Sequence, residues 1–361
     1  MRLDLPPGFP TEAFITEAPE AALLPAGPWV LLGDRAIEAA WRGAGLPVPP
    51  GSLFVETSEA TKRLDTLLPW LEAWAALPLH RDATVVAAGG GVLTDMAGLA
   101  AALFLRGVAW HSWPTTLLAQ VDAGLGGKTA VNLAAGKNLA GAFHPPARLV
   151  ACRGFLAALP PRQRESGFWE VLKMAFVEGD AAWAAALLEE PSPGSASLAR
   201  ALVLKAGVVD RDPAEHGERR LLNLGHTLGH ALESASGFTL LHGEAVGLGL
   251  LAALLLAEAE GLPPFPAALK VRLAARLEPL AALAAPFEAC RPFLLRDKKA
   301  GTRAASPESA GPSEIHCILP APGRRAEIRP LPPDAWKGPH RRMMELLAGV
   351  RPRPRGPEPT H

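Results

Sequence analysis

The chain has 361 residues, of which 49% are apolar, so it can bury a substantial core and has the length of about two domains. Lysine plus arginine and aspartate plus glutamate both number 36. This balance excludes an overall field that would attract nucleic acid or an anionic membrane, so any anion site must be a local cluster of cations.

The first 150 residues alternate between short apolar runs and segments with helical spacing. Strands are expected at Trp29–Leu32, Leu53–Val55, Thr84–Ala88 and Val108–Trp113, and helices at Ala36–Arg42, Glu59–Ala76 and Val92–Leu105. Such alternation is typical of a parallel sheet with helices on its faces. We therefore predict an α/β N-terminal domain with a Rossmann-like parallel sheet over residues 1–157, which would bind a nucleotide.

After Leu159-Pro160-Pro161 the sequence changes to long segments rich in alanine and leucine. Helices are expected at Glu165–Val177, Ala196–Val209, Leu221–Ser236, Gly243–Glu260 and Ala267–Leu283. This pattern predicts a mostly α-helical C-terminal domain over residues 158–349, which would bind metal and substrate. Residues 350–361 are rich in proline and arginine, which predicts a disordered tail.

The cysteines and the N-terminus bear on the compartment. The three cysteines, Cys152, Cys290 and Cys317, lie far apart and form no CxxC pair, which favours a reducing compartment over a disulfide framework. Met1 to Pro10 lacks the pattern of a signal peptide, and the longest apolar runs are shorter than the roughly 20 residues of a membrane span. We expect a cytoplasmic protein that binds no nucleic acid and no membrane.

A strand, a glycine turn and a helix follow one another around Gly89-Gly90-Gly91. Glycine lets the backbone approach a phosphate, and the helix N-terminus adds N–H groups, so this turn fits a dinucleotide. The spacing is not GxGxxG, and a plain tight turn explains it equally well. Thr115-Thr116 can donate to a ribose or phosphate or can cap the next helix, and Asp95 can simply complement the helix dipole.

Three of the ten histidines, His226, His230 and His242, fall within 17 residues. On a helix, His226 and His230 would share one face. Imidazole plus carboxylate, with one position left for substrate, is a typical ligand set of a divalent metal. The candidate carboxylates are Glu170, Glu233 and Glu244. Histidines satisfied in the core or on the surface are the alternative, but three with this spacing favour metal binding or acid–base function.

Cations accompany these motifs. Lys128 and Lys137 each follow glycine, where an ammonium group can reach a phosphate. Five further cations lie later in the chain, at Lys173, Lys205, Arg219, Lys298 and Lys299. Taken singly, each is explained as a solvated surface charge, and only the set indicates an anionic ligand.

From about Glu59 to Lys299, the ordered motifs resemble those of the 3-dehydroquinate synthase family of sugar-phosphate cyclases. The motifs are Gly89-Gly-Gly-Val-Leu-Thr-Asp95, Leu105-Arg106-Gly107, Pro114-Thr-Thr-Leu-Leu-Ala-Gln-Val-Asp122, Gly126-Gly-Lys128, Gly136-Lys-Asn138, Glu170-Val-Leu-Lys173, Arg219 to His230, Leu241-His-Gly-Glu244 and Asp297-Lys-Lys299. So many matches in one order are highly specific. The departures are Ala123-Gly124, where the family usually has serines, and Leu99, where it often has an aromatic residue.

The resemblance implies that a divalent metal, zinc or cobalt, is held by Glu170, His226 and His242, whereas His230 faces the substrate. It implies NAD contacts from Glu59, Lys62, Gly90, Gly91, Asp95, Thr115, Thr116, Lys128 and Lys137. It implies that the substrate phosphate meets Lys128, Asn138, Asn223, His230 and Lys298 or Lys299, with Arg106 reaching in from the second subunit of a homodimer. The substrate carboxylate would pair with Lys205 and Arg219, and Asp122 and Lys173 would bind hydroxyls.

The implied reaction is that of a phosphorus–oxygen lyase. A phosphorylated sugar acid, 3-deoxy-D-arabino-heptulosonate 7-phosphate, would become 3-dehydroquinate and phosphate, a step of the shikimate pathway to aromatic amino acids. The implied course is transient oxidation by NAD, β-elimination of phosphate, reduction and intramolecular aldol closure.

Three alternatives stay open. A metal-dependent dehydrogenase of the glycerol type would not need the set of lysines and arginines. A cyclase for a neutral sugar phosphate, such as a deoxy-inosose synthase, would not need Arg219 and Asn223. A non-catalytic NAD-binding regulator would not need Glu170, His226 and His242.

Overall fold

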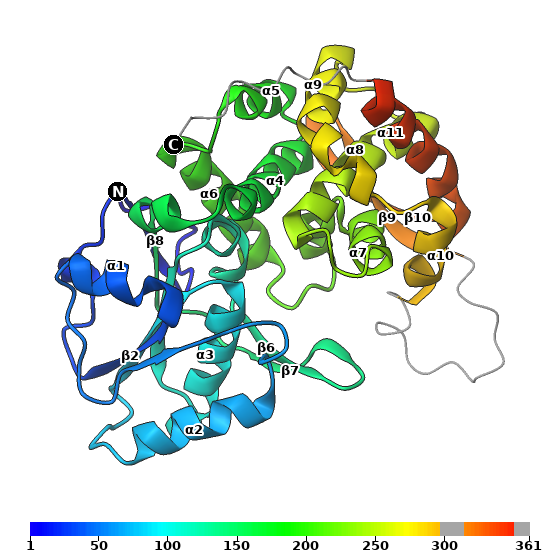
Figure 1. The fold of residues 1–361 in the computed structure, drawn as a ribbon. Coiled ribbons are helices and arrows are strands. Elements are labelled where there is room, and N and C mark those ends of the chain that lie inside the picture. The colour runs from blue at the N-terminus through cyan, green and yellow to red at the C-terminus, as the bar shows by residue number, and fades with distance from the viewer. Residues whose placement is uncertain (297–313, 350–361) are drawn as a thin grey trace, which may run out of the picture. The chain divides into compact units, whose positions relative to one another are not determined.

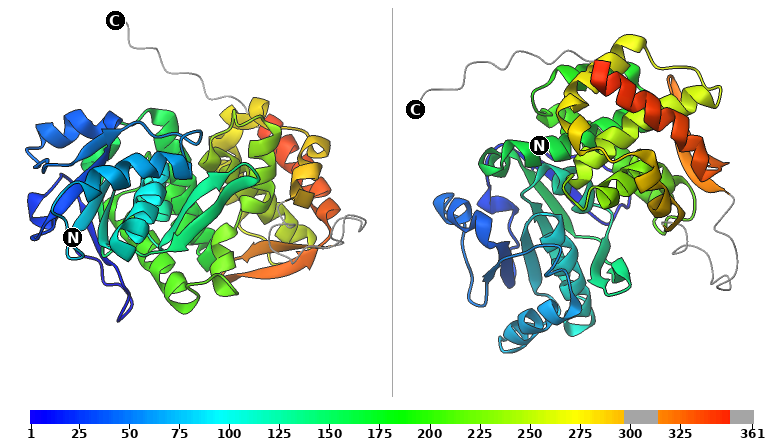
Figure 2. Two further views of the ribbon diagram at one scale, coloured as in Figure 1. Left: turned by 90° about the horizontal axis from the view of Figure 1, so that it is seen from below. Right: turned by 45° about the vertical axis from the view of Figure 1, so that its right-hand side comes forward.

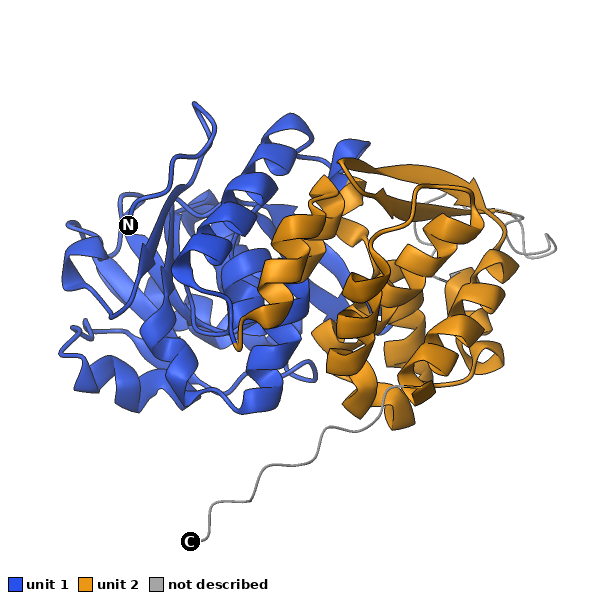
Figure 3. Ribbon diagram, turned by 90° about the horizontal axis from the view of Figure 1, so that it is seen from above, with its two compact units in different colours: residues 1–171, 192–219 blue, residues 172–191, 220–361 orange. Residues whose placement is uncertain are grey.

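The structure is a computed structural model that describes residues 1–296 and 314–349 (Figure 1). The chain divides into two compact units (Figure 3): residues 1–171 with 192–219 form unit 1, and residues 172–191 with those from 220 onward form unit 2. The boundary expected at residue 157 stays a prediction. The expected tail from residue 350 lies outside the described residues, as do Lys298 and Lys299.

Unit 1 contains a six-stranded, fully parallel sheet in the order β1-β8-β5-β4-β2-β3. The strands are β1 (Glu12–Thr16), β2 (Trp29–Asp34), β3 (Leu53–Val55), β4 (Thr84–Gly89), β5 (Ala109–Pro114) and β8 (Arg148–Cys152). The α/β fold predicted for the N-terminal part is therefore confirmed. The sequence interpretation found the four central and edge strands β2 to β5 but not β1 and β8.

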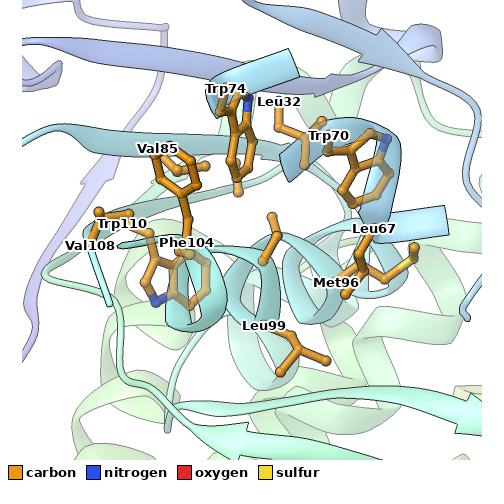
Figure 4. Close-up of a cluster of buried hydrophobic side chains, with 14 of the residues drawn as sticks. Leu32, Leu67, Trp70, Trp74, Val85, Met96, Leu99, Phe104, Val108 and Trp110 are labelled. Carbon is orange, nitrogen blue, oxygen red and sulfur yellow. The ribbon is translucent and has the colours of Figure 1, made fainter. Parts of the chain in front are cut away.

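Helices cover both faces of this sheet because its strands are apolar on both sides. Along β4, Val85 and Ala87 face the core of Figure 4, which α2 (Leu64–Ala75) and α3 (Gly91–Leu103) complete. The alternate residues Val86 and Ala88 face the opposite core, where they meet Trp41 of α1 (Glu38–Gly43). Figure 1 shows α1 and α3 on opposite sides of the sheet. Packing in the two cores fixes the positions of the strand ends and of the loops that follow them.

An antiparallel hairpin of β6 (Lys128–Leu133) and β7 (Gly136–Phe143) precedes β8. Thr129 of this hairpin packs against Gly98 of α3, where an added methyl group would lie only 2.4 Å from Thr129 Cγ2. The close approach of α3 and β6 therefore requires glycine. The sequence analysis did not predict this hairpin, although it carries Lys128, Lys137 and Asn138.

Helices dominate the rest of the chain. They are α4 (Pro161–Glu178), which begins in unit 1 and ends in unit 2, α5 (Ala181–Glu189), α6 (Ser195–Arg211) in unit 1, α7 (His226–Ala235), α8 (His242–Ala259), α9 (Ala267–Leu277), α10 (Phe287–Arg296) and α11 (Lys337–Gly349). A mostly helical C-terminal part is thus confirmed. The sequence interpretation did not include α5, α10, α11 or the antiparallel pair β9 (Ile315–Ala321) and β10 (Arg324–Leu331). In Figure 2, α11 is the red helix, and β9 and β10 are the orange strands.

One expected helix begins later than predicted. Instead of a helix from Leu221, a 3-10 turn (Glu218–Asn223) is followed by Gly225 in the left-handed conformation, at φ 80°, and α7 then begins at His226. Glycine adopts this conformation at little cost, so Gly225 resets the direction of the chain.

Helix α8 is the one helix among the described residues that is long and apolar enough to cross a membrane. Most of it, 83%, is buried inside the protein, as expected of a core helix.

Candidate functional site

Three neighbouring strands of unit 1 end side by side, and a loop with site residues follows each of them. β2 ends at Asp34, β4 at Gly89, and β5 just before Thr115. The N–H of Thr115 donates to the carbonyl of Gly89 at 2.9 Å, so two of these loops are joined directly. In open parallel sheets, ligands bind outside the carboxyl ends of the strands, which makes this edge the candidate nucleotide site.

The glycine turn leaves no room for side chains at its first position. A methyl group added at Gly89 would lie 2.5 Å from Leu93, and one at Gly90 would lie 3.4 Å from Thr116. Gly90 is the N-cap of α3 and offers no capping side chain. The first N–H groups of α3 have no helical acceptor, and an anion such as a phosphate can accept from them.

Lys62, which is only 3% exposed, links two other segments of this unit. Its ammonium group donates to Asp95 Oδ2 and to Asn138 Oδ1, each at 2.6 Å. Burial raises the pKa of Asp95 to about 6, although Lys62 acts in the opposite direction. The fold thus brings together two residues expected at NAD and one expected at the substrate phosphate.

Asp122 lies in a π-helical turn (Ala119–Ala123), in which the N–H of Gly124 donates to the carbonyl of Ala119 at 2.7 Å. Such wide turns often occur at functional sites. Lys205 of α6, which is 5% exposed, donates to both the carbonyl and the carboxylate of Asp122. A buried ammonium group is thereby paired with an adjacent carboxylate.

Arg219 is 4% exposed and is held by two carbonyl groups. Its guanidinium donates to the carbonyl of Pro213 at 2.7 Å and to that of Gly126 at 3.0 Å. A methyl group on Gly126, which has φ 106°, would lie 2.8 Å from the same guanidinium, so glycine is needed there. Burial lowers the pKa of Arg219, but an arginine stays charged at any physiological pH.

An acidic loop before Arg219 completes the cation cluster. Asp212 accepts the backbone N–H groups of His216, Gly217 and Arg219, and these bonds lower the pKa of Asp212 to about 2. Within this loop Glu215 forms an ion pair with Lys128, and its charge also acts on Arg219. The charge of Glu215 therefore acts on both Lys128 and Arg219 in unit 1.

Unit 2 brings the three predicted histidines together. Nitrogen atoms of His226, His230 and His242 all lie within 4.8 Å of one another, and their ring centroids are 5.2 to 5.6 Å apart. His226 Nδ1 lies 3.2 Å from the carbonyl of Leu224, and His242 Nδ1 lies 3.4 Å from Glu233. Such contacts fix the tautomer that presents Nε2 to a metal.

Histidine nitrogens together with a carboxylate oxygen fit zinc or cobalt, because both ions accept these ligand atoms. Of the candidate carboxylates, Glu244 caps α8 by accepting the N–H of Leu241 at 2.8 Å, and Glu233 lies beside His242. Glu170 and Lys173 lie one helical turn apart on α4, and both are buried, with Glu170 only 1% exposed.

The remaining predicted residues are more exposed. Glu59, Lys137 and Asn223 are exposed, and Asn223 ends the 3-10 turn just before Gly225. Arg106 is also exposed and lies on a turn where it and Leu105 both have positive φ, at 66° and 50°.

Sequence reasoning missed Glu215 as the partner of Lys128 and did not select Asn132 of the hairpin. The turn at Gly33-Asp34-Arg35 is only loosely similar to the family's nucleotide-binding turn, so Asp34 is not among the predicted residues. The acidic character of residues 210–218 was a signal for Glu215. Asp34 accepts a hydrogen bond from Thr57 at 2.6 Å, and no spacing in the sequence indicates this contact.

A parallel α/β unit with a glycine turn and buried cations, followed by a helical unit with clustered histidines, defines a class of two-part proteins for charged small molecules. Two family descriptions match the chain: 3-dehydroquinate synthase N-terminal over residues 52–166, and 3-dehydroquinate synthase C-terminal over residues 167–300. The chain belongs to the 3-dehydroquinate synthase family.

Individual relatives agree with this membership. The 3-dehydroquinate synthase of Paracoccus denitrificans is 45% identical over 225 residues, which are 59% of this chain and 60% of that protein. A crystal structure of 2-deoxy-scyllo-inosose synthase is 25% identical, with a TM-score of 0.76 over 94% of this chain and 98% of that one. The 2-epi-5-epi-valiolone synthase ValA from Streptomyces hygroscopicus, with NAD+ and Zn2+ bound, is 26% identical, with a TM-score of 0.73 over 92% and 96%. The chain spans about three fifths of the length of the curated relatives it matches.

Proposed function

We propose that the protein converts 3-deoxy-D-arabino-heptulosonate 7-phosphate into 3-dehydroquinate and phosphate, with NAD and a divalent metal as cofactors. The observation that carries the proposal is the set of buried cations in unit 1. Lys205 and Arg219 are almost fully buried, and Lys128 lies in the same electrostatic environment as Arg219. Lys205 already pairs with Asp122 and Lys128 with Glu215, and a substrate with both a carboxylate and a phosphate can accept further charge-assisted hydrogen bonds from these cations and from Arg219.

In this proposal the residues bind and orient the substrate. Arg219 and Lys205 hold the carboxylate, and Lys128 and Asn138 hold the phosphate, together with Asn223 and His230. Asp122 and Lys173 accept or donate hydrogen bonds at the hydroxyl groups. These contacts fix the reacting groups and favour departure of phosphate by stabilising its developing charge.

The cofactors supply the chemistry that side chains lack. NAD, bound at the strand ends by residues such as Lys62, Asp95 and Thr115, would supply a reversible hydride acceptor. A zinc or cobalt ion, bound by Glu170, His226 and His242, would supply a Lewis acid for negative charge on substrate oxygen. The bound NAD+ and Zn2+ of the ValA structure support both cofactors.

The decisive experiment is to incubate the purified protein with the heptulosonate phosphate and NAD+ and to follow phosphate release. We expect release that stops on chelation of metal, with no accumulation of NADH. A rise in nicotinamide absorbance in step with substrate loss would instead indicate a net dehydrogenase, and release unaffected by a chelator would refute the metal.

A second candidate is a cyclase for a neutral sugar phosphate, which the whole-chain similarity to 2-deoxy-scyllo-inosose synthase favours. Arg219 distinguishes the two. For an acidic substrate we expect Arg219→Gln to lower kcat/KM about 100-fold, since truncating a buried charge pair costs about 2–5 kcal/mol. Arg220→Gln is the matched control at the next position, and folding of both variants is checked by urea unfolding. Equal kcat/KM in both variants would favour the neutral substrate.

We further propose that the protein is a cytoplasmic homodimer in which Arg106 completes the partner's phosphate site. Its exposure on a turn with positive φ supports this role, and the three buried cysteine thiols support a reducing compartment. Mixing the inactive variants Arg106→Ala and Lys128→Ala should restore part of the activity, because mixed dimers regain one intact site. No recovery after subunit exchange would refute the role in trans.

A further inference from the structure

Asn132, a hairpin residue that the proposed function does not use, joins three segments that carry proposed ligands. Its Nδ2 donates to the carboxylate of Glu59 at 3.1 Å and to the carbonyl of Glu59 at 3.3 Å. Its Oδ1 accepts the N–H of Asn138 at 2.9 Å. Its own N–H donates to the carbonyl of Lys62 at 2.7 Å. One residue therefore makes three hydrogen bonds to the loop before α2 and one to the strand β7.

An irregularity in the hairpin explains how Asn132 reaches both segments. Val131 pairs with Ala140, but Leu133 pairs with Gly136, so the register shifts at Asn132. Three residues of β7, 137–139, lie opposite the single residue Asn132, so the extra residues of this irregularity belong to β7. The backbone N–H of Asn132 leaves the regular ladder and donates to Lys62 instead. Val131 is fully buried in the core, which gives Asn132 a rigid base.

Two polar contacts hold Asn138 in place. Its backbone is left-handed, at φ 56°, a conformation that asparagine adopts more readily than most residues other than glycine. Asn132 holds its N–H, and the Lys62 ammonium group holds its side-chain oxygen at 2.6 Å. The backbone N–H of Asn132 contacts Lys62 and its side chain contacts Glu59, so Asn132 links the loop that carries these residues to Asn138.

We propose that Asn132 is a positioning residue that sets the NAD ligands Glu59 and Lys62 and the phosphate ligand Asn138 in register with each other. The inference rests on the proposed function, because it assumes that these residues bind NAD and phosphate. Asn132 itself touches neither ligand. Removing its side chain breaks the hydrogen bonds to Glu59 and Asn138 and leaves the backbone bond to Lys62, so the loop and the hairpin are coupled less tightly and both binding steps weaken together.

The test compares Asn132→Ala with Thr129→Val in the full-length protein. Thr129 donates to the carbonyl of Ala142 in the same hairpin, so its replacement removes a hairpin hydrogen bond without touching the loop. For Asn132→Ala we expect the Kd for NAD+, measured by calorimetry, and the KM for the sugar phosphate each to rise about tenfold, since one to two net hydrogen bonds correspond to about that factor. For Thr129→Val both should stay within about twofold of wild type. Equal effects of the two substitutions would overturn the inference.

A double-mutant cycle with Glu59 separates positioning from general loosening of the hairpin. If Asn132 acts through Glu59, Asn132→Ala should weaken NAD+ binding much less in a Glu59→Ala background than in wild type. Fully additive losses would overturn the inference. If Asn132→Ala fails to fold, Asn132→Asp takes its place. This variant keeps the acceptor for the N–H of Asn138 but sets a carboxylate against the carboxylate of Glu59. The Kd for NAD+ should therefore rise more than the KM for the sugar phosphate. An unchanged Kd would contradict the inference, whereas a wild-type protein that binds no NAD+ would refute the proposed function itself.

Discussion

Helices α7 and α8 cross at glycine residues, and Gly249→Ala tests how far the histidine cluster depends on that crossing. A methyl group at Gly249 would lie 1.9 Å from the carbonyl oxygen of Gly225 and 3.1 Å from the nitrogen of Gly229. Both contacts are backbone atoms, which cannot rotate away as a side chain can. The helices would therefore have to separate by about 1.5 Å to restore an ordinary contact.

Two opposing effects set the magnitude. Overpacking of this kind costs about 1–3 kcal/mol or more, whereas replacing glycine by alanine within a helix gains about 1 kcal/mol. We expect a net loss of about 1–2 kcal/mol in the free energy of unfolding. The effect on metal should be larger, because His226 and His230 begin α7 and His242 begins α8. Metal–ligand distances tolerate shifts of only about 0.2 Å, so we expect metal affinity to fall about 10- to 100-fold.

The assay is urea unfolding of the metal-free protein, followed by Zn2+ or Co2+ titration against a chelating dye. Gly338→Ala in α11 is the matched control, because nothing lies within 4 Å of a methyl group there. It should leave metal affinity unchanged and leave stability equal or slightly higher. If Gly249→Ala bound metal as tightly as Gly338→Ala, the close helix crossing would not be what positions the histidines.

Three further predictions concern unit 1 and the start of α5. Burial lowers the pKa of His111 from 6.5 to about 4, so the unfolded chain takes up its proton first as the pH falls. Stability should be complete above pH 6.5 and decline by about 3 kcal/mol toward pH 4, and urea unfolding of His111→Asn should lack this component. The buried Gln120 donates to the carbonyls of Pro114 and Cys152 at 3.1 and 2.8 Å. Gln120→Leu should therefore lower the free energy of unfolding by about 2–4 kcal/mol in the same assay, and a loss below about 0.5 kcal/mol would contradict this. Asp180 caps α5 through the N–H of Trp183 at 2.8 Å, and Asp180→Ala should cost about 1 kcal/mol, whereas Asp180→Asn should cost little.

The sequence predicted those parts of the fold that repeat a strong local pattern. β4 and α3 lie on either side of a run of three glycines, and most of α8 is an apolar run. All three elements could therefore be placed to within a few residues. β1 and β8 escaped because little in their own sequences marks them as strands, and pairing in the sheet defines them: β1 pairs with β8, and β8 also pairs with β5. The break before α7 escaped because a left-handed Gly225 becomes necessary only where the chain must pass close to α8.

The candidate site divides in the same way. Residue types with obvious chemistry, such as the three histidines and the lysines after glycine, could be selected from the sequence. Asn132 and Glu215 could not, because their roles depend on backbone conformation. Asn132 lies at a shift in strand register, and Glu215 has φ 62°, and tertiary contacts determine both conformations.

The contacts also explain how a chain with no net charge can hold an anion site. Three of the proposed ligand lysines are each paired with an acid of the same unit: Lys62 with Asp95, Lys205 with Asp122 and Lys128 with Glu215. The paired acids hold the ammonium groups in place before any ligand binds, so that an arriving carboxylate or phosphate meets prepositioned cations. Local pairing thus reconciles the balanced composition with the proposed site for a doubly anionic substrate.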